Sequence, residues 1–160
     1  MKMPFTFGAA LLICAVFASP ATAQNVTADI DDIAQVIRAE GMQAKIEKAD
    51  DGRPYILSGI SGYNFVVRPY GCDDAWKNCK FVQFRAAFAP KTKPTLAEVN
   101  KHAADNFFGR FYLDEDNDPV IEMDLNLEVG GMSRELFVDN IACWDSALTE
   151  FAEFAFSKDD

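Results

Sequence analysis

Few residues in this chain have the types and spacing that catalysis requires. His102 is the only histidine, so a Ser-His-Asp or Cys-His arrangement would have to use it. No G-x-S-x-G sequence is present, and Ser133 precedes a helical pattern as a capping residue would. We therefore expect His102 to be a partly exposed helix residue, and the sequence predicts no catalytic residue.

Two carboxylates, Glu122 and Asp124, lie two residues apart in an alternating segment, so they would share one face of a strand. A carboxylate pair on one face could act as general acid and base in a hydrolase. Acids that alternate with apolar residues are also the usual solvent side of a strand. We favour the solvent side and keep a small hydrolase as an alternative.

The acidic run Asp114–Asp118 has aspartates at the first, third and fifth positions of a calcium loop. The sixth position of such a loop requires glycine and the twelfth a bidentate glutamate. Here these positions hold Pro119 and Leu125, and the flanking patterns are strands. The run therefore predicts a solvated hairpin turn, and no metal site is expected.

The chain has four cysteines. Cys72 and Cys79 enclose a six-residue polar loop, and in an oxidising compartment a disulfide between them is the expected outcome. Closing so short a loop should stabilise the fold by roughly 2–3 kcal/mol. Cys143 is then left over as a small, buried apolar residue, and Cys14 falls in the leader described next.

Residues 1–23 have the layout of a secretory signal peptide. Lys2 is followed by the uncharged, mostly apolar run 5–17, and Ala21-Thr22-Ala23 forms a small-x-small cleavage site. We expect a mature protein that begins at Gln24, folds as one domain over residues 24–160, and is periplasmic or secreted. No membrane anchor is expected after cleavage.

The net charge is −10, and loss of Lys2 with the leader would make it one unit more negative. Nucleic acids and anionic lipids are bound through clusters of Lys and Arg, which this sequence lacks. The charge therefore argues against nucleic-acid partners, and no motif indicates a cofactor.

Hydrophobic periodicity predicts a helix, four strands, a helix, two strands and a long final helix. The first expected helix begins at Thr27 or Asp29, and the other two begin near Thr95 and Ser133. The expected strands cover 42–49, 55–60, 63–70, 80–89, 111–114 and 120–129. Connections of hairpin length make this an α+β fold with an antiparallel sheet and helices packed on one face.

Three apolar patterns predict which side chains face the core. Strand 80–89 should present Val82, Phe84, Ala86 and Phe88 inward. In strand 120–129, every second residue up to and including Val129 should face inward. The second helix should bury Leu96, Val99, Ala103 and Phe107. The final helix should bury the stripe Phe137, Ile141, Trp144, Leu148, Phe151 and Ala155.

A second apolar strip on the final helix has two readings. It comprises Leu136, Cys143, Ala147 and Phe154, with Phe156 on the opposite flank of the main stripe. The helix could be buried over a wide arc, or these aromatic residues could contact a partner protein or a second copy of the chain. The candidate partner surface comprises Phe154, Phe156 and Phe108.

Several segments carry a family resemblance: Phe107-Phe108-Gly109-Arg110-Phe111-Tyr112-Leu113-Asp114, then Pro119-Val120-Ile121-Glu122-Met123-Asp124-Leu125, then Gly130-Gly131. With Gly62-Tyr63-Asn64-Phe65-Val66-Val67 and the paired cysteines, they resemble exported members of the YbjN-like family. Its members are labelled bacterial sensory transduction regulators. Lys101-His102-Ala103 departs from the aromatic and second Asn that many members carry there.

The resemblance implies a fold similar to type III secretion chaperones, which are often dimers that hold other proteins, and it implies no enzymatic activity. We therefore expect an exported, non-enzymatic protein-binding or regulatory, chaperone-like domain. Alternatives are a small periplasmic hydrolase and a protein that binds a small ligand between helix and sheet.

Overall fold

The computed structural model describes residues 25–159, so the predicted leader and Cys14 lie outside the described residues. The elements in chain order are α1 (Ile30–Ala39), β1 (Lys45–Lys48), β2 (Pro54–Ile60), β3 (Tyr63–Tyr70), β4 (Phe81–Ala87), α2 (Leu96–Asp105), β5 (Arg110–Leu113), β6 (Pro119–Asn126) and α3 (Arg134–Phe156). This is the predicted order, and the α+β prediction is confirmed.

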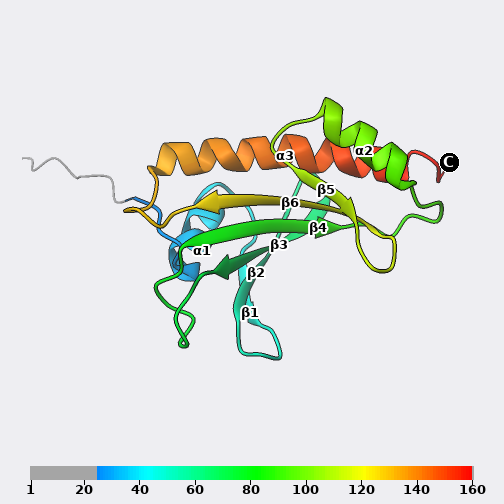
Figure 1. Ribbon diagram of the computed structural model, residues 1–160. Helices are drawn as coiled ribbons and strands as arrows, with labels where there is room; N and C mark the ends of the chain where they lie inside the picture. Colours follow the sequence, from blue (N-terminus) through cyan, green and yellow to red (C-terminus); the bar gives the residue numbers. More distant parts are fainter. Residues whose placement is uncertain (1–24, 160) are drawn as a thin grey trace, which may run out of the picture.

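The six strands form one sheet in the order β1-β2-β3-β4-β6-β5, and every neighbouring pair is antiparallel. Because β6 lies between β4 and β5, the chain leaves the sheet after β4, forms α2 beyond the β5 edge and returns (Figure 1). α3 runs across the sheet above β6 and β4 (Figure 1).

Side chains from one face of the sheet and from α1 and α3 form the core. Val67, Phe84 and Met123 lie in register on three adjacent strands and are buried. Trp144 of α3 packs against Phe65 and Phe84, with ring centroids 5.7 Å away from each. The space between helix and sheet is therefore filled by aromatic rings.

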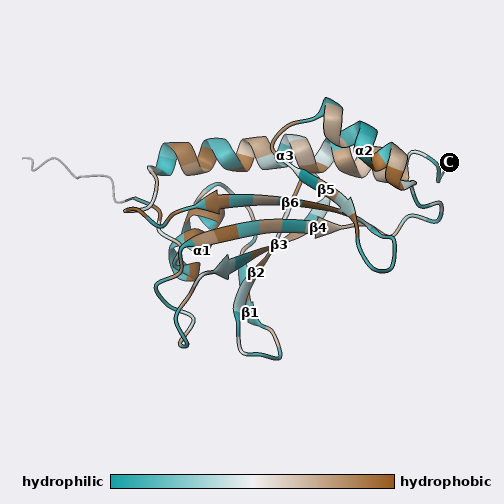
Figure 2. Ribbon diagram, in the orientation of Figure 1, coloured by the Kyte–Doolittle hydropathy of each residue, from teal (hydrophilic) through white to brown (hydrophobic). Residues whose placement is uncertain are grey.

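The predicted inward residues of β4 and of α3 are confirmed as buried. Hydrophobic and hydrophilic residues alternate over much of β4 and β6 (Figure 2), although each strand begins with consecutive apolar residues. Ser133 caps α3 as expected, since its hydroxyl accepts a hydrogen bond from the backbone N–H of Leu136. Within residues 25–159 no helix is long and apolar enough to cross a bilayer.

The prediction that Val129 faces inward is wrong, because its side chain is 91% exposed. β6 ends at Asn126, and Leu127 makes one more hydrogen bond, to the Lys80 carbonyl. The chain then turns away from the sheet as the Gly131 N–H donates to the Leu127 carbonyl.

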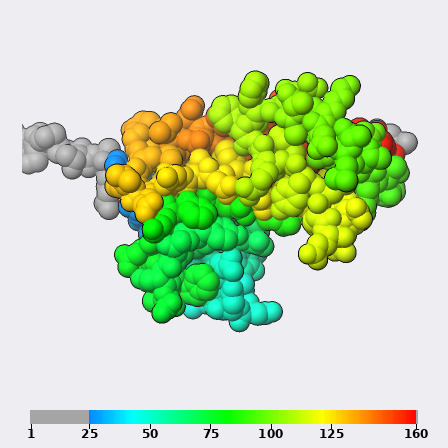
Figure 3. Space-filling model, viewed as in Figure 1, coloured from blue at the N-terminus to red at the C-terminus, as the bar shows by residue number. Residues whose placement is uncertain are grey.

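The predicted inner face of α2 is also wrong, because Val99 is the only one of its four residues that is buried. Leu96 and Phe107 are 64% and 81% exposed, and Ala103 is exposed. α2 contacts β5, and its His102 ring meets Phe111 of β5 and Phe154 near the end of α3. In Figure 3 the green atoms of the α2 region cover most of the red end of α3 from this side.

Candidate functional site

The turn between α2 and β5 presents two adjacent phenylalanines to solvent. Phe107 is 81% exposed and Phe108 is 63% exposed. Phe108 has a φ of 62°, in the left-handed region that bulky residues rarely adopt. The next residue is Gly109, where any side chain would collide with the Phe111 ring. The glycine lets the chain pass over Phe111, and the turn holds both phenylalanines outside the core.

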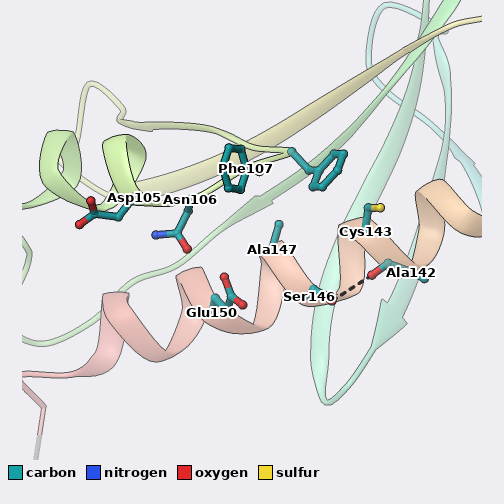
Figure 4. Close-up of a pocket in the computed structure, with 9 residues that line it drawn as sticks. Asp105, Asn106, Phe107, Ala142, Cys143, Ser146, Ala147 and Glu150 are labelled. Atoms are coloured by element: carbon teal, nitrogen blue, oxygen red, sulfur yellow. Dashed lines mark hydrogen bonds between the residues drawn. The ribbon is translucent and has the colours of Figure 1, made fainter.

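These phenylalanines border a groove of about 490 Å³ against α3, which we call the α3 groove. Its lining residues are Asp105, Asn106, Phe107, Phe108, Ala142, Cys143, Ser146, Ala147 and Glu150. Figure 4 shows Cys143 and Ala147 projecting from α3 toward the side on which Phe107 lies. The Ser146 hydroxyl donates to the Ala142 carbonyl at 3.2 Å, so it is used within the helix (Figure 4).

Aromatic packing fixes the position of α2 over α3. The His102 ring stacks on Phe154 with centroids 4.6 Å apart, and meets Phe111 of β5 edge-on at 4.9 Å. At the start of α2, Glu98 accepts hydrogen bonds from the Thr95 N–H and from Lys158, both within 2.8 Å. These contacts tie both ends of α2 to the rest of the fold.

The charges around the α3 groove are negative. Asp105 and Glu150 line it, both are exposed, and neither forms an ion pair with any residue in the described part of the chain. Burial lowers the pKa of His102 below its ordinary value, whereas the charges of Glu150 and Asp105 act to raise it. Burial prevails, so the ring is neutral near pH 7.

The structure separates the three residues of the predicted partner surface. Phe108 borders the α3 groove. Phe154 is half-buried, stacked between His102 and Phe151, and Phe156 is 37% exposed with its ring edge-on to Phe88. Cys143 is half-buried and lines the groove, where the sequence predicted full burial.

The opposite face of the sheet carries a polar network, which makes the expectation of a solvated Glu122 wrong. Glu122 is only 7% exposed, because β4 and β5 on either side of β6 place large cations over it. It accepts a hydrogen bond from Tyr112 at 2.9 Å and pairs with the guanidinium groups of Arg110 and Arg85. Asp124, the other carboxylate, pairs with Arg110 at 3.1 Å and stays more exposed. Each carboxylate is engaged in ion pairs, which suits a structural role.

The disulfide between Cys72 and Cys79 is present in the structure. Within the loop, the Asp73 carboxylate accepts hydrogen bonds from the backbone N–H groups of Ala75 and Lys77. Trp76 lies against the guanidinium of Arg53, 5.2 Å from its ring centroid. The loop is thus a compact cap at the end of β3 and β4.

The acidic run Asp114–Asp118 forms the β5–β6 hairpin turn, as predicted. Asp114 accepts hydrogen bonds from the N–H groups of Asp116 and Asp118, and Lys93 pairs with Asp118 at 2.8 Å. Among residues 25–159, no three His, Cys, Asp or Glu side chains converge as metal ligands would.

The sequence reasoning missed Phe107 and the carboxylates beside it, because it placed Phe107 on the inner face of α2. One local signal was available. In Phe107-Phe108-Gly109-Arg110 the glycine marks a turn, and residues of a turn cannot continue the buried face of the preceding helix.

Comparison with known proteins is informative at the level of the family. Residues 29–156 match the model of the YbjN family, described as "Putative bacterial sensory transduction regulator". No curated protein and no solved structure matches the chain. Since the match covers α1 through α3, the chain belongs to the YbjN family.

Proposed function

We propose that this chain is a non-enzymatic regulatory domain that acts outside the cytoplasm and binds another protein through the α3 groove. The observation that carries the proposal is the pair of exposed phenylalanines, Phe107 and Phe108, held at the mouth of that groove. Aromatic residues beside an apolar groove are characteristic anchors of protein interfaces.

The backbone of Phe108 supports this proposal. A left-handed conformation costs a bulky residue about 1–2 kcal/mol, and a side chain that is 63% exposed recovers little of that by burial. Strained residues of this kind cluster at binding sites, where the strain presents a side chain to a ligand. The conformation of Phe108 is explained if its ring is buried by a partner.

A regulatory role agrees with the description of the family, whose members are assigned to sensory transduction. The surroundings of the titratable groups favour binding over catalysis. His102 faces three phenylalanine rings, and Glu122 is paired with two arginines. The aromatic filling between α3 and the sheet argues against a small-ligand site there.

Export is supported by the layout of residues 1–23 and by the Cys72–Cys79 disulfide, since disulfides persist in oxidising compartments. N-terminal sequencing of the protein from a periplasmic fraction should begin at Gln24. Recovery of the full chain from the cytoplasm with reduced Cys72 and Cys79 would contradict export.

The binding proposal is tested with Phe107→Ser and a matched variant, Leu96→Ser, at an exposed apolar position near the start of α2. Tagged wild-type and variant chains are crosslinked in cells and captured, and the captured proteins are quantified. A specific partner should be retained by Leu96→Ser and strongly depleted by Phe107→Ser. Equal recovery with both variants would contradict the assignment of the groove.

A further inference from the structure

The α3 groove combines an apolar floor with an acidic rim. Cys143 and Ala147 form part of its floor on α3, and Leu136 lies two turns before Cys143 on the same side of the helix, 51% exposed. Asp105 lines the groove from the end of α2, and Glu150 lines it from α3. Asp139 lies three turns before Glu150, so it extends the acidic rim along α3.

The three rim carboxylates are exposed and make no ion pair with any residue between 25 and 159. Other acidic side chains among these residues differ among themselves: Asp118 and Glu128 are paired with lysines, whereas Asp74 and Glu115 are exposed and unpaired. What distinguishes the rim is that its unpaired charges lie beside the exposed rings of Phe107 and Phe108.

We infer that the partner docks a basic amphipathic segment in the α3 groove: apolar side chains contact Phe107, Phe108 and the floor, and Lys or Arg side chains reach the rim. This inference rests on the proposed function and specifies the chemistry of its partner. Apolar contacts with Phe107 and Phe108 supply affinity, and complementary rim charges supply orientation and selectivity.

The same charges argue against a second copy of the chain as the occupant. A two-fold symmetric dimer built on this groove would place the rim of one copy against the rim of the other. Like charges facing each other oppose association, and the chain as a whole carries a net charge of −10.

The test uses the purified protein and two synthetic peptides. Both are amphipathic helices with leucines on one side; one carries lysines on the other side and its counterpart carries glutamates. Calorimetry should show binding of the lysine peptide, weakening as salt is added, and an affinity at least about tenfold lower for the glutamate peptide.

Two double variants with the same change in net charge test whether the rim carboxylates cause the preference for the lysine peptide. Asp105→Asn with Glu150→Gln removes rim charges, whereas Asp74→Asn with Glu115→Gln removes exposed, unpaired charges outside the groove. The rim variant should bind the lysine peptide roughly threefold to tenfold more weakly than the control variant, as expected for two partly exposed ion pairs.

The inference is overturned by equal affinity for both peptides, by equal weakening in both double variants, by binding of neither peptide, or by a dimer that Phe107→Ser dissociates. If the lysine peptide binds through Phe107 but is unaffected by the rim variant, the groove still binds apolar segments. In that case the proposed function stands and the basic partner is rejected.

Discussion

His102 of α2 stacks on Phe154 of α3 with ring centroids 4.6 Å apart and ring planes 28° apart. This stack holds the C-terminal half of α2 against α3. Phe154 lies in the last turn of the 23-residue helix α3, and His102 lies in the last turn of α2, shortly before the turn that contains Phe107. Packing at His102 thereby determines where the exposed phenylalanines lie.

Stability should fall in mildly acidic solution because of His102. Burial lowers the pKa of His102 below its ordinary value of 6.5, so below that pH the unfolded chain takes up a proton more readily than the folded chain. The free energy of unfolding should decrease as the pH falls from about 7.5 to about 5.5. Urea unfolding at both pH values measures this change.

His102→Phe keeps an aromatic ring at this position and removes the titration. The decrease between the two pH values should be smaller in this variant than in the wild type. The charges of Glu150 and Asp105 act on His102, and both residues are kept in the variant, so the two proteins differ only at position 102. An identical pH dependence in the two proteins would show that His102 is not responsible.

Removing the carboxylate of Glu122 should destabilise the sheet more than removing that of Asp124. Glu122→Ala removes the buried carboxylate that both Arg85 and Tyr112 contact, which should cost about 1–3 kcal/mol. The side chain of Asp124 is 41% exposed, so Asp124→Ala should cost less than about 1 kcal/mol. The urea midpoints of the two variants measure the two losses of stability. A larger loss for Asp124→Ala than for Glu122→Ala would contradict the structural role of the network.

Loss of the disulfide should lower the free energy of unfolding by roughly 2–3 kcal/mol. The double variant Cys72→Ala with Cys79→Ala tests this, with Cys143→Ala as the control at a cysteine outside the disulfide. Trp76 should become more mobile relative to Arg53. Tryptophan fluorescence can follow this, because Trp144 is fully buried and its signal should stay constant. Equal stability of the double variant and the wild type would contradict a structural role.

Phe108→Asn should separate stability from binding. Asn tolerates the left-handed conformation better than phenylalanine does, so this variant should be as stable as the wild type or up to about 1 kcal/mol more stable. Partner binding should weaken, because the exposed ring is removed. A loss of stability would show that the ring supports the fold, and the functional argument from its strain would fail.

Sequence patterns predicted the elements, the face of β4 and the main stripe of α3, because each depends on residues close together in one element. They failed for Glu122, whose burial depends on Arg110 from β5 and Arg85 from β4. The alternation of one strand cannot show which long cations its neighbours place over it.

The candidate site was predicted only in part. Phe108 was predicted to belong to the partner surface, whereas Phe107 was assigned to the inner face of α2. That assignment continued the helical spacing past Asp105, where α2 ends, so Phe107 falls in the turn instead. Which positions of α2 become buried depends on tertiary contacts that helical periodicity does not contain.

Photo-crosslinking in cells is the most direct test of the central claim that the α3 groove binds a partner protein. One variant carries a photoreactive residue in place of Phe107, and a second variant carries it in place of Leu96. The two positions are about 15 Å apart along α2 and its turn, and both are well exposed. A protein that crosslinks from position 107 and not from position 96 is the predicted result. Crosslinks only from position 96, or the same products from both positions, would contradict the claim.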